Sequence, residues 1–363
     1  MQLIPIYLCV ATAAAILLPP TDGPYQVKWE SQELIDYNRP DPFNTSRPRR
    51  LMISKFTPVP IANCLETCRV PYMPEFIANL EDEIIATFIL PTVWPKGEIK
   101  QLEIEGCCKS KSSCSSGKFP KIIFDTGLNT TRLSYSWTAQ HIASLGYEVI
   151  VPDHPYETDV IIYPDGEILY GNQIKKTIPS LEYGLTVRAK DTTFLLDKLR
   201  IKRTVFIGQS YGGAAAAESI LADKRIAGGV NLDGMMFGPA VKQGINKPFL
   251  IFDSDGHNST SDQSYADFLA AMGKNHPDVW VREVTVKGSG HGSGYDMPII
   301  GDVTGHRDNQ ELVDIMYGGI SGSRMKVMLQ RYLGDFIEFA LHSKGPGVLA
   351  GPNKDFPEVI YLH

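Results

Sequence analysis

Residues 208–212 spell GQSYG, the G-x-S-x-G pattern that can present a serine as a nucleophile. The apolar run TVFI precedes the pattern and four alanines follow it, which predicts a strand before Ser210 and a helix after it. On such a turn the serine is held in a strained conformation, and the flanking glycines let neighbouring backbone approach closely. The alternative is an ordinary glycine-rich turn. A general base and an acid elsewhere in the chain would argue against that alternative.

A serine is a poor nucleophile without a base, and the base needs an acid to fix its tautomer. For a serine on a strand-to-helix turn, the expected chain order is serine, acid, histidine. His291, in GSGHGSG, comes directly after the apolar run VWVREVTV and its short turn, and it fits that order, so we predict that it is the base. His306 lies in a later polar loop and is the second choice. Three other histidines follow no pattern that would bring them to the serine: His154, His257 and His276.

Three aspartates satisfy the same order. Asp233 follows the run AGGVNL, whereas Asp253 and Asp255 follow the next apolar run, PFLIF. Aspartate is also common in turns after strands because its side chain bonds to nearby backbone. The residues alone therefore leave the acid open among these three.

The negative charge that develops on a substrate oxygen requires two backbone N–H donors. One would be the N–H of Tyr211, the residue after the serine, and the other that of Leu128 in the loop DTGL. Because every group in this scheme belongs to the protein, we expect no cofactor and no metal ion. Asn129 begins a sequon in the same loop, and we expect it to carry no glycan because a sugar would obstruct the pocket.

From residue 121 onward, short apolar runs alternate with stretches of helical periodicity. This alternation predicts a mostly parallel sheet covered by helices on both faces. In such sheets ligands bind outside the carboxyl ends of the strands, which is where the candidate residues lie. No linker interrupts the pattern, so we predict a single catalytic domain over residues 61–363.

The sequence also predicts the secondary structure of three further segments, before and within this region. Residues 19–60 are rich in proline and polar residues and predict an irregular N-terminal arm. The runs EIIATFIL (83–90) and EIKQLEIE (98–105) predict two antiparallel strands, followed by a surface loop over 106–118. Residues 153–171 predict a hairpin that turns at PDG, and this hairpin either reshapes the pocket or only extends the sheet.

The first 20 residues, MQLIPIYLCVATAAAILLPP, carry no charge. We assign residues 1–18 to a secretory signal peptide, cut after Ala13 or Ala15, because a long apolar run there contains small residues. The basic residues that usually begin a signal peptide are absent, and Pro5 interrupts the run. The alternatives are therefore an uncleaved anchor and a buried N-terminal helix.

Cysteine usage agrees with export. Five cysteines follow the assigned signal in two clusters: Cys64, Cys68, Cys107, Cys108 and Cys114. In an oxidising compartment they would pair across the clusters, giving two disulfides and leaving one cysteine over. Cys107 and Cys108 are poorly placed to bond each other, because adjacent α-carbons are only about 3.8 Å apart. A zinc site is the alternative, but the spacing matches no common zinc pattern.

Charge and sequons limit the classes of partner. The net charge is −6 and only short basic runs occur, which argues against nucleic acid as a partner. Two further sequons, at Asn44 and Asn258, are candidate glycosylation sites of a secreted protein.

The segments GQSYGG, NLDGMMFGP, PFLIFDSD and VKGSGHGSGYD resemble the secreted, plasma-type platelet-activating factor acetylhydrolases and their lipase-like α/β-hydrolase relatives. The segment FDTGLNTTRLSYS resembles that family's oxyanion loop, and the similarity covers residues 120–300. The resemblance implies an α/β-hydrolase fold, with a mostly parallel central sheet, helices on both faces and antiparallel N-terminal strands. The family's acid lies in a Leu-Asp turn followed by Met-Phe, which favours Asp233 over Asp253. The family often has histidine before the oxyanion glycine, where this chain has Thr126.

The resemblance also implies calcium-independent hydrolysis of short or oxidised sn-2 acyl esters of phospholipids, through an acyl-enzyme on Ser210. Two alternatives remain: a general short-chain carboxylesterase or cutinase-like polyesterase with the same triad, and a non-catalytic secreted lipid-binding protein. In every case the expected partner is a lipid or a small-molecule ester. The sequence leaves open the acyl-chain length, the oligomeric state, and peripheral contact with a membrane or lipoprotein surface.

Overall fold

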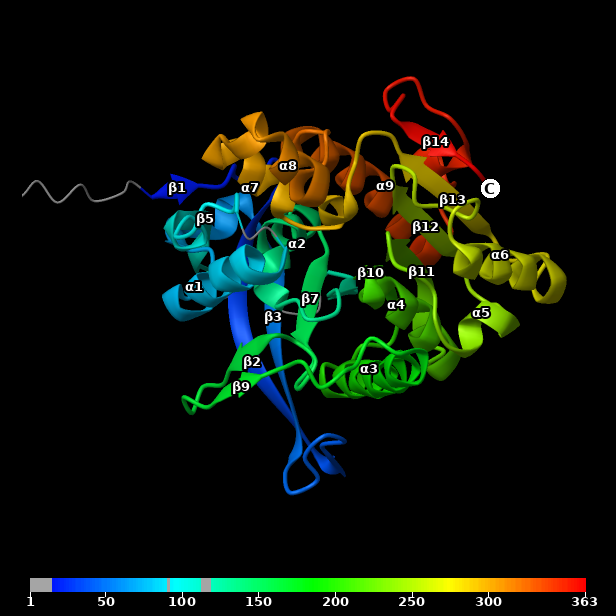
Figure 1. The fold of residues 1–363 in the computed structure, drawn as a ribbon, viewed down its shortest axis with the longest axis horizontal. Coiled ribbons are helices and arrows are strands. Elements are labelled where there is room, and N and C mark those ends of the chain that lie inside the picture. Colours follow the sequence, from blue (N-terminus) through cyan, green and yellow to red (C-terminus); the bar gives the residue numbers. More distant parts are fainter. Residues whose placement is uncertain (1–14, 90–91, 112–118) are drawn as a thin grey trace, which may run out of the picture.

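The computed structural model describes residues 15–89, 92–111 and 119–363. A sheet of nine strands crosses the middle of the described chain, in the order β14-β13-β12-β11-β10-β6-β7-β3-β2 (Figure 1). The inner strands from β13 to β7 run parallel, whereas β14 at one edge and β3 and β2 at the other pair antiparallel. The strands are β2 (Tyr25–Pro40), β3 (Pro48–Pro60), β6 (Lys121–Asp125), β7 (Glu148–Asp153), β10 (Thr204–Gln209), β11 (Ile226–Leu232), β12 (Phe249–Ser254), β13 (Val281–Val286) and β14 (Val359–Tyr361).

Helices cover both faces of this sheet, as the alternating pattern predicts. On one face lie α2 (Ser136–Ala143) and α9 (Gly322–His342), and on the other lie α3 (Ile178–Lys198), α4 (Tyr211–Ala222) and α6 (Gln263–Asn275) (Figure 1). Strand β10 shows why the inner strands are continuously apolar: Val205 and Ile207 pack toward α9, whereas Phe206 packs toward α3 and α4. The α/β-hydrolase fold class is confirmed.

Shorter elements connect these layers. They are the helices α5 (Pro239–Gln243), α7 (Met297–Thr304) and α8 (Gln310–Leu312), the π-helical turn η7 (Val313–Tyr317), and the 3₁₀ turns η1 (Ile61–Asn63), η3 (Ile99–Gln101), η4 (Arg132–Tyr135), η5 (His291–Gly294), η6 (His306–Asp308) and η8 (Gly347–Ala350).

A second layer packs beside the central sheet. It contains a small sheet of β1 (Ile16–Leu17), β5 (Leu102–Ser110) and β4 (Cys64–Pro71), together with α1 (Glu75–Ile84) and its π-helical extension η2 (Ile85–Ile89). Ile77 of α1, Ile104 of β5 and Ile300 of α7 share one apolar core, which joins this layer to the rest of the protein.

The expectation of an irregular arm over residues 19–60 is wrong. Strands β2 and β3 form a long antiparallel hairpin there, and β3 pairs with β7. Proline is tolerated at strand ends and on edge strands, and here Pro40, Pro48 and Pro60 mark the ends of β2 and β3. The antiparallel N-terminal strands of the fold therefore exist, but earlier in the chain than expected.

The expected strand at 83–90 is also wrong, because residues 75–89 are helical. A short apolar run cannot by itself distinguish a strand from a buried helix. The expected strand at 98–105 begins only at Leu102 and continues to Ser110, so the first part of the expected surface loop is strand. The rest of that loop, from residue 112, lies outside the described residues.

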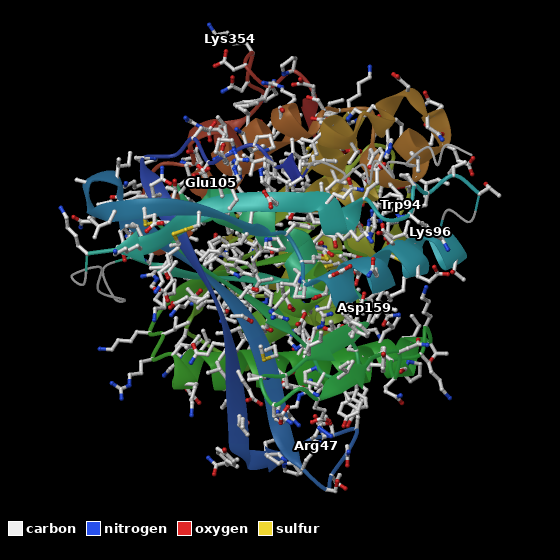
Figure 2. The ribbon with its side chains drawn as sticks, turned by 90° about the vertical axis from the view of Figure 1, so that its left-hand side faces the viewer. Arg47, Trp94, Lys96, Glu105, Asp159 and Lys354 are labelled. Carbon is white, nitrogen blue, oxygen red and sulfur yellow. A yellow bond between two sulfur atoms is a disulfide. The ribbon has the colours of Figure 1, made fainter. Side chains whose placement is uncertain are left out.

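The hairpin expected within 153–171 is confirmed. Strands β8 (Val160–Ile162) and β9 (Ile168–Tyr170) pair antiparallel and form a sheet of their own, so they do not extend the central sheet. Arg50 of β3 binds Glu167 beside the turn at 2.7 Å, and Arg47 binds the same carboxylate at 2.6 Å. Figure 2 shows Arg47 near the tip of the β2–β3 hairpin, and Asp159 is the residue directly before β8. The insertion is thus fixed against the edge of the fold.

Two disulfides link β4 to β5, namely Cys64–Cys107 and Cys68–Cys108. Pairing across the two clusters is confirmed, and the neighbouring cysteines 107 and 108 each bond a different partner. Cys114 lies outside the described residues.

The assigned signal peptide falls mostly outside the described residues, but its last part does not. Ile16 and Leu17 pair with Leu102 and Glu103 of β5, and the side chain of Leu18 is fully buried in the core of the second layer. The assigned end at residue 18 would remove this strand, whereas cleavage after Ala13 or Ala15 would retain it. Within the described chain, no helix combines the length and the apolar character needed to cross a membrane.

Candidate active site

Ser210 lies on the sharp turn between β10 and α4, as the sequence predicts. Its φ of 55° and ψ of −124° are unfavourable for a residue with a side chain, and such strain commonly marks functional positions. A Cβ on Gly208 would lie 1.9 Å from the carbonyl oxygen of Gly212, and one on Gly212 would lie 2.7 Å from that of Asp125. Both glycines of the motif are therefore required for the turn to pack against the sheet.

The turn after β10 and the loops after β11 and β13 bring Ser210, His291 and Asp233 together. His291 Nε2 lies 3.1 Å from Ser210 Oγ, and His291 Nδ1 lies 2.6 Å from Asp233 Oδ2. Because a carboxylate only accepts hydrogen bonds, Nδ1 carries a proton and Nε2 of the neutral ring is free to accept the serine hydroxyl. The arrangement can deprotonate the serine as a substrate carbonyl is attacked.

Asp233 is held as an anion by its donors. Its Oδ1 accepts the Ser254 backbone N–H at 2.9 Å and hydroxyl at 2.8 Å, and also His257 Nδ1 at 2.8 Å. Burial alone would raise the pKa of the Asp233 carboxyl, but hydrogen bonds from His257 and His291 hold that pKa well below its usual range. Asp233 therefore stays charged throughout the neutral range.

The other two aspartates considered as the acid form no hydrogen bond with His291. Asp253 is buried beneath Asp233, and burial together with the charge of Asp233 raises the pKa of its carboxyl well above the usual value. Asp255 accepts the N–H of Gly288 at 2.8 Å. For Asp253, the alternative acid, burial and the neighbouring charge thus favour the neutral form.

Of the remaining histidines, two lie away from Ser210 in the hydrogen-bond network and two bind carboxylates at or next to the site. His306, the second choice for the base, pairs with Glu98 at 3.1 Å, and His276 lies at the end of α6. His154 and His257, which the sequence gave no reason to place near Ser210, each bind a carboxylate that belongs to the site or supports it. Both follow a strand of the central sheet, and that position is the signal that could have identified them.

The two residues expected to supply the oxyanion donors, Tyr211 and Leu128, line one pocket together with Ser210. Tyr211 is the first residue of α4, and the first N–H groups of a helix have no acceptor within it. Leu128 lines the same pocket as Ser210, and a Cβ on Gly127 would lie 3.4 Å from the Ser210 Cβ. The loop after β6 is thus in contact with the serine turn.

Arg188 of α3 supports this loop from behind. Its guanidinium donates to the carbonyl oxygens of Thr126 at 2.5 Å and Gly127 at 3.2 Å, and to Asp125 Oδ2 at 3.0 Å. In a trans peptide the C=O and the following N–H point in opposite directions. By holding the Gly127 carbonyl, Arg188 turns the Leu128 N–H away from itself. Thr126 stands where the resembling family often has a histidine, and in this chain the side chain that holds the loop is Arg188 of α3.

His154 fixes the start of the same loop. Its ring lies between Asp125, at 2.9 Å from Nε2, and Asp191, at 2.8 Å from Nδ1. Burial alone would lower the pKa of His154, but the charge of Asp125 and hydrogen bonds to both carboxylates raise it to about 9. Arg49 of β3 binds Asp191 at 2.7 Å, so the N-terminal hairpin is tied to the loop through a buried ion network.

Two pockets meet at Ser210. One, of about 550 Å³, has a partly apolar lining that includes Met235 and Phe237. The other, of about 760 Å³, extends toward the insertion and is lined in part by Tyr170. Leu128 and Lys176 line both. A further hollow of about 780 Å³ lies between β2 and α3, and none of the site residues lines it.

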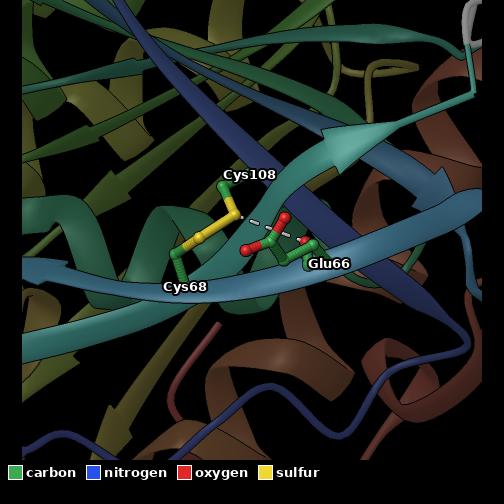
Figure 3. A group of neighbouring side chains, drawn as sticks. All are labelled: Glu66, Cys68 and Cys108. Atoms are coloured by element: carbon green, nitrogen blue, oxygen red, sulfur yellow. Dashed lines mark hydrogen bonds between the residues drawn. A yellow bond between two sulfur atoms is a disulfide. The ribbon is translucent and has the colours of Figure 1, made fainter.

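Two clusters in the described chain bring potential metal ligands together, and neither suits a cation. The first consists of Glu66, Cys68 and Cys108 (Figure 3). Both sulfurs of that cluster are consumed in a disulfide. The second consists of Asp233, Asp253 and His257. In that cluster Asp253 is neutral and His257 is hydrogen-bonded to Asp233, so little negative charge is left for an ion.

Comparison with known proteins identifies the family of this chain. Residues 167–307 match the family model "Platelet-activating factor acetylhydrolase, isoform II". A probable 1-alkyl-2-acetylglycerophosphocholine esterase of Arthroderma benhamiae is 35% identical, over 96% of this chain and 94% of the relative. A platelet-activating factor acetylhydrolase of Cavia porcellus is 26% identical over 60% of this chain and 58% of its own.

The fold is also similar to that of a solved structure, the ferulic acid esterase of Streptomyces cinnamoneus. The TM-score is 0.78 at 24% identity, covering 96% of this chain and all of the other. The full-length match to the Arthroderma relative shows the family. This chain is an ester hydrolase that belongs to the platelet-activating factor acetylhydrolase, isoform II, family.

Proposed function

We propose that this protein is a secreted serine esterase that hydrolyses short-chain or oxidised sn-2 acyl esters of phospholipids. The observation that carries the proposal is the hydrogen-bond chain from Ser210 through His291 to Asp233 at the mouth of two pockets. The names of the Arthroderma and Cavia relatives support the substrate class.

In the proposed mechanism Ser210 Oγ attacks the ester carbonyl while His291 Nε2 takes its proton. The negative charge that develops on the carbonyl oxygen is stabilised by the N–H groups of Tyr211 and Leu128. His291 then gives the proton to the leaving alcohol, and an acyl-enzyme remains on Ser210. A water molecule, deprotonated by the same imidazole, releases the acid and restores the serine. Asp233 keeps the imidazole in the productive tautomer throughout.

The two pockets suggest how a phospholipid would lie. The smaller pocket, with Leu181, Met235 and Phe237 in its lining, suits a short acyl chain. The larger pocket carries Lys176 and Tyr170, which suit the phosphate and the polar head of the same molecule. In this arrangement the insertion 153–171 shapes the site.

We further propose that the protein is exported and forms one catalytic domain that includes the β2–β3 hairpin. The two disulfides support export, because such bonds persist in oxidising compartments. Ion pairs from Arg49 and Arg50 bind the hairpin to the rest of the fold and support a single domain. Glycosylation at Asn44, in the turn of that hairpin, and at Asn258, in the loop after β12, stays a prediction. Mass spectrometry of the secreted protein would test the two glycosylation sites and would also locate the signal-peptide cleavage site.

The decisive experiment labels the purified protein with an active-site phosphonate and locates the adduct by mass spectrometry. The adduct is expected on Ser210, and Ser210→Ala should fold normally yet hydrolyse no ester. Failure to label an intact protein would favour a non-catalytic lipid-binding role. For the labelled enzyme, rates on an acetylated ether phospholipid, a p-nitrophenyl ester and a soluble polyester distinguish the proposed substrate from those of a general esterase or polyesterase.

A further inference from the structure

Asp233 binds two histidines, one on each oxygen. His291 lies against Oδ2 and is the base of the proposed triad, whereas His257, in the loop between β12 and α6, lies 2.8 Å from Oδ1 through its Nδ1. The opposite nitrogen of His257, Nε2, lies 2.9 Å from Asp262 Oδ2. A serine-histidine-aspartate mechanism does not require this second histidine.

The geometry fixes the charge of His257. Both of its ring nitrogens face carboxylates, and a carboxylate can only accept a hydrogen bond. Both nitrogens therefore carry protons, and the ring is an imidazolium. Asp262 cannot turn away readily, because its other oxygen accepts the Ser264 N–H at 2.8 Å at the start of α6. The hydrogen bond to Asp233, although opposed by burial, raises the pKa of His257 to about 9, which agrees with this charge.

The groups that face His257 come from every element around it. Asp233 follows β11, Asp253 lies in β12, Asp262 precedes α6 and His291 follows β13. The ring of Tyr265, in α6, packs against it with centroids 5.0 Å apart. Burial and the charge of Asp233 favour the neutral form of Asp253, so the local charges are the Asp233 and Asp262 carboxylates and the His257 cation.

We propose that His257 is a positioning residue of the active site, which holds Asp233 in place and whose fixed positive charge opposes protonation of His291. The consequence is that the enzyme keeps a neutral, working base at lower pH than it would with Asp233 alone. The inference rests on the proposed function, because it assumes that His291 is the base. His257 lines the pocket that contains Ser210, yet both its nitrogens are engaged, so it acts through Asp233 rather than on the substrate.

The test is the pH dependence of kcat/KM for His257→Gln on a soluble short-chain ester. Glutamine can still donate one hydrogen bond to Asp233 but carries no charge. We expect the acid limb of the profile to move upward by about one pH unit, because removing a like charge that shares the Asp233 carboxylate makes protonation of His291 easier. The matched control is His276→Gln at the end of α6, which should keep the wild-type profile.

A purely structural role would lower kcat/KM by the same factor at every pH and leave the acid limb in place, and that result would overturn the proposal. If His257→Gln fails to fold, ¹⁵N NMR of histidines in the wild-type protein at about pH 7.5 decides, because an imidazolium has two protonated nitrogens. A neutral His257 would overturn the proposal. If instead the phosphonate fails to label Ser210, the proposed function fails, which is a separate outcome.

Discussion

Replacing Asp233 by asparagine tests the proposed triad most directly, because the hydrogen bonds around Asp233 determine which way the new amide must turn. Three donors converge on Oδ1 of Asp233: the N–H and the hydroxyl of Ser254, and Nδ1 of His257. The single oxygen of an asparagine would be held there by all three. Its NH₂ group would then face His291.

That orientation would reverse the tautomer of His291, the proposed base. An NH₂ group donates, so His291 Nδ1 would have to accept, and its proton would move to Nε2, which faces Ser210. The ring could no longer take the serine proton. Loss of the correct tautomer in a serine-histidine-aspartate site lowers kcat by about 10⁴, or roughly 5 kcal/mol of transition-state stabilisation. The fold should be little affected, because the three Oδ1 hydrogen bonds are kept.

The assay is steady-state hydrolysis of a p-nitrophenyl ester and of an acetylated ether phospholipid, with folding checked by circular dichroism. The matched control is Asp253→Asn, which replaces a neutral buried carboxyl with a neutral amide of the same shape. It should change kcat by less than about threefold, because no charge is lost. Retention of more than about a tenth of kcat in Asp233→Asn, or a larger loss in Asp253→Asn, would refute the reasoning.

Two further predictions concern the groups that support the site. Arg188→Lys should lower kcat by about 10- to 100-fold with little change in KM, because a lysine cannot hold Asp125 and the two loop carbonyls together. Arg203→Lys is the control. Arg203 also binds a backbone carbonyl, that of Ala340, but it directly precedes β10, at the opposite end of that strand from Ser210, and it forms none of the hydrogen bonds of the site. Equal losses in the two variants would contradict a role for Arg188 in the oxyanion loop. Stability should also depend on pH, because the pKa values of His154 and His257 are raised from 6.5 to about 9 in the folded protein. Their contribution is complete below pH 6.5, the unfolded pKa, and is lost as the pH rises through about 9. Urea unfolding across that range should therefore show a falling free energy of unfolding, with a smaller fall in His257→Gln, and a flat profile would show that the two rings are not charged.

The alternating part of the fold could be predicted because its signals are local. A strand buried on both faces must be continuously apolar, and the turn that carries Ser210 needs glycines at fixed offsets. The positions of Asp233 and His291 follow from the same rule, since side chains just after parallel strands gather at one edge of the sheet. These three residues meet in the structure although they are up to 81 positions apart.

The N-terminal third could not be predicted in the same way. Strand β3 is stabilised by pairing with β7, about a hundred residues later in the chain. The sequence of residues 48–60 contains no signal that identifies this partner strand. In the same region α1 buries Ile77, Ala78, Glu81 and Asp82, so two acidic groups lie on its inner face and obscure the helical pattern. Composition therefore suggested an irregular arm and a strand where the chain forms a hairpin and a helix.

The electrostatics of the site lie beyond the sequence for a different reason. Asp233 and Asp253 both follow apolar strands, and both side chains are buried. They differ because donors from Ser254, His257 and His291 reach Asp233, while in the described structure the oxygens of Asp253 have no hydrogen-bond partner. Burial favours the neutral acid unless donors offset it, so one carboxyl is charged and the other is not. The proposal of Asp233 as the acid therefore depends on hydrogen bonds from Ser254 and His257, and the positions of these donors are set by the folded loops.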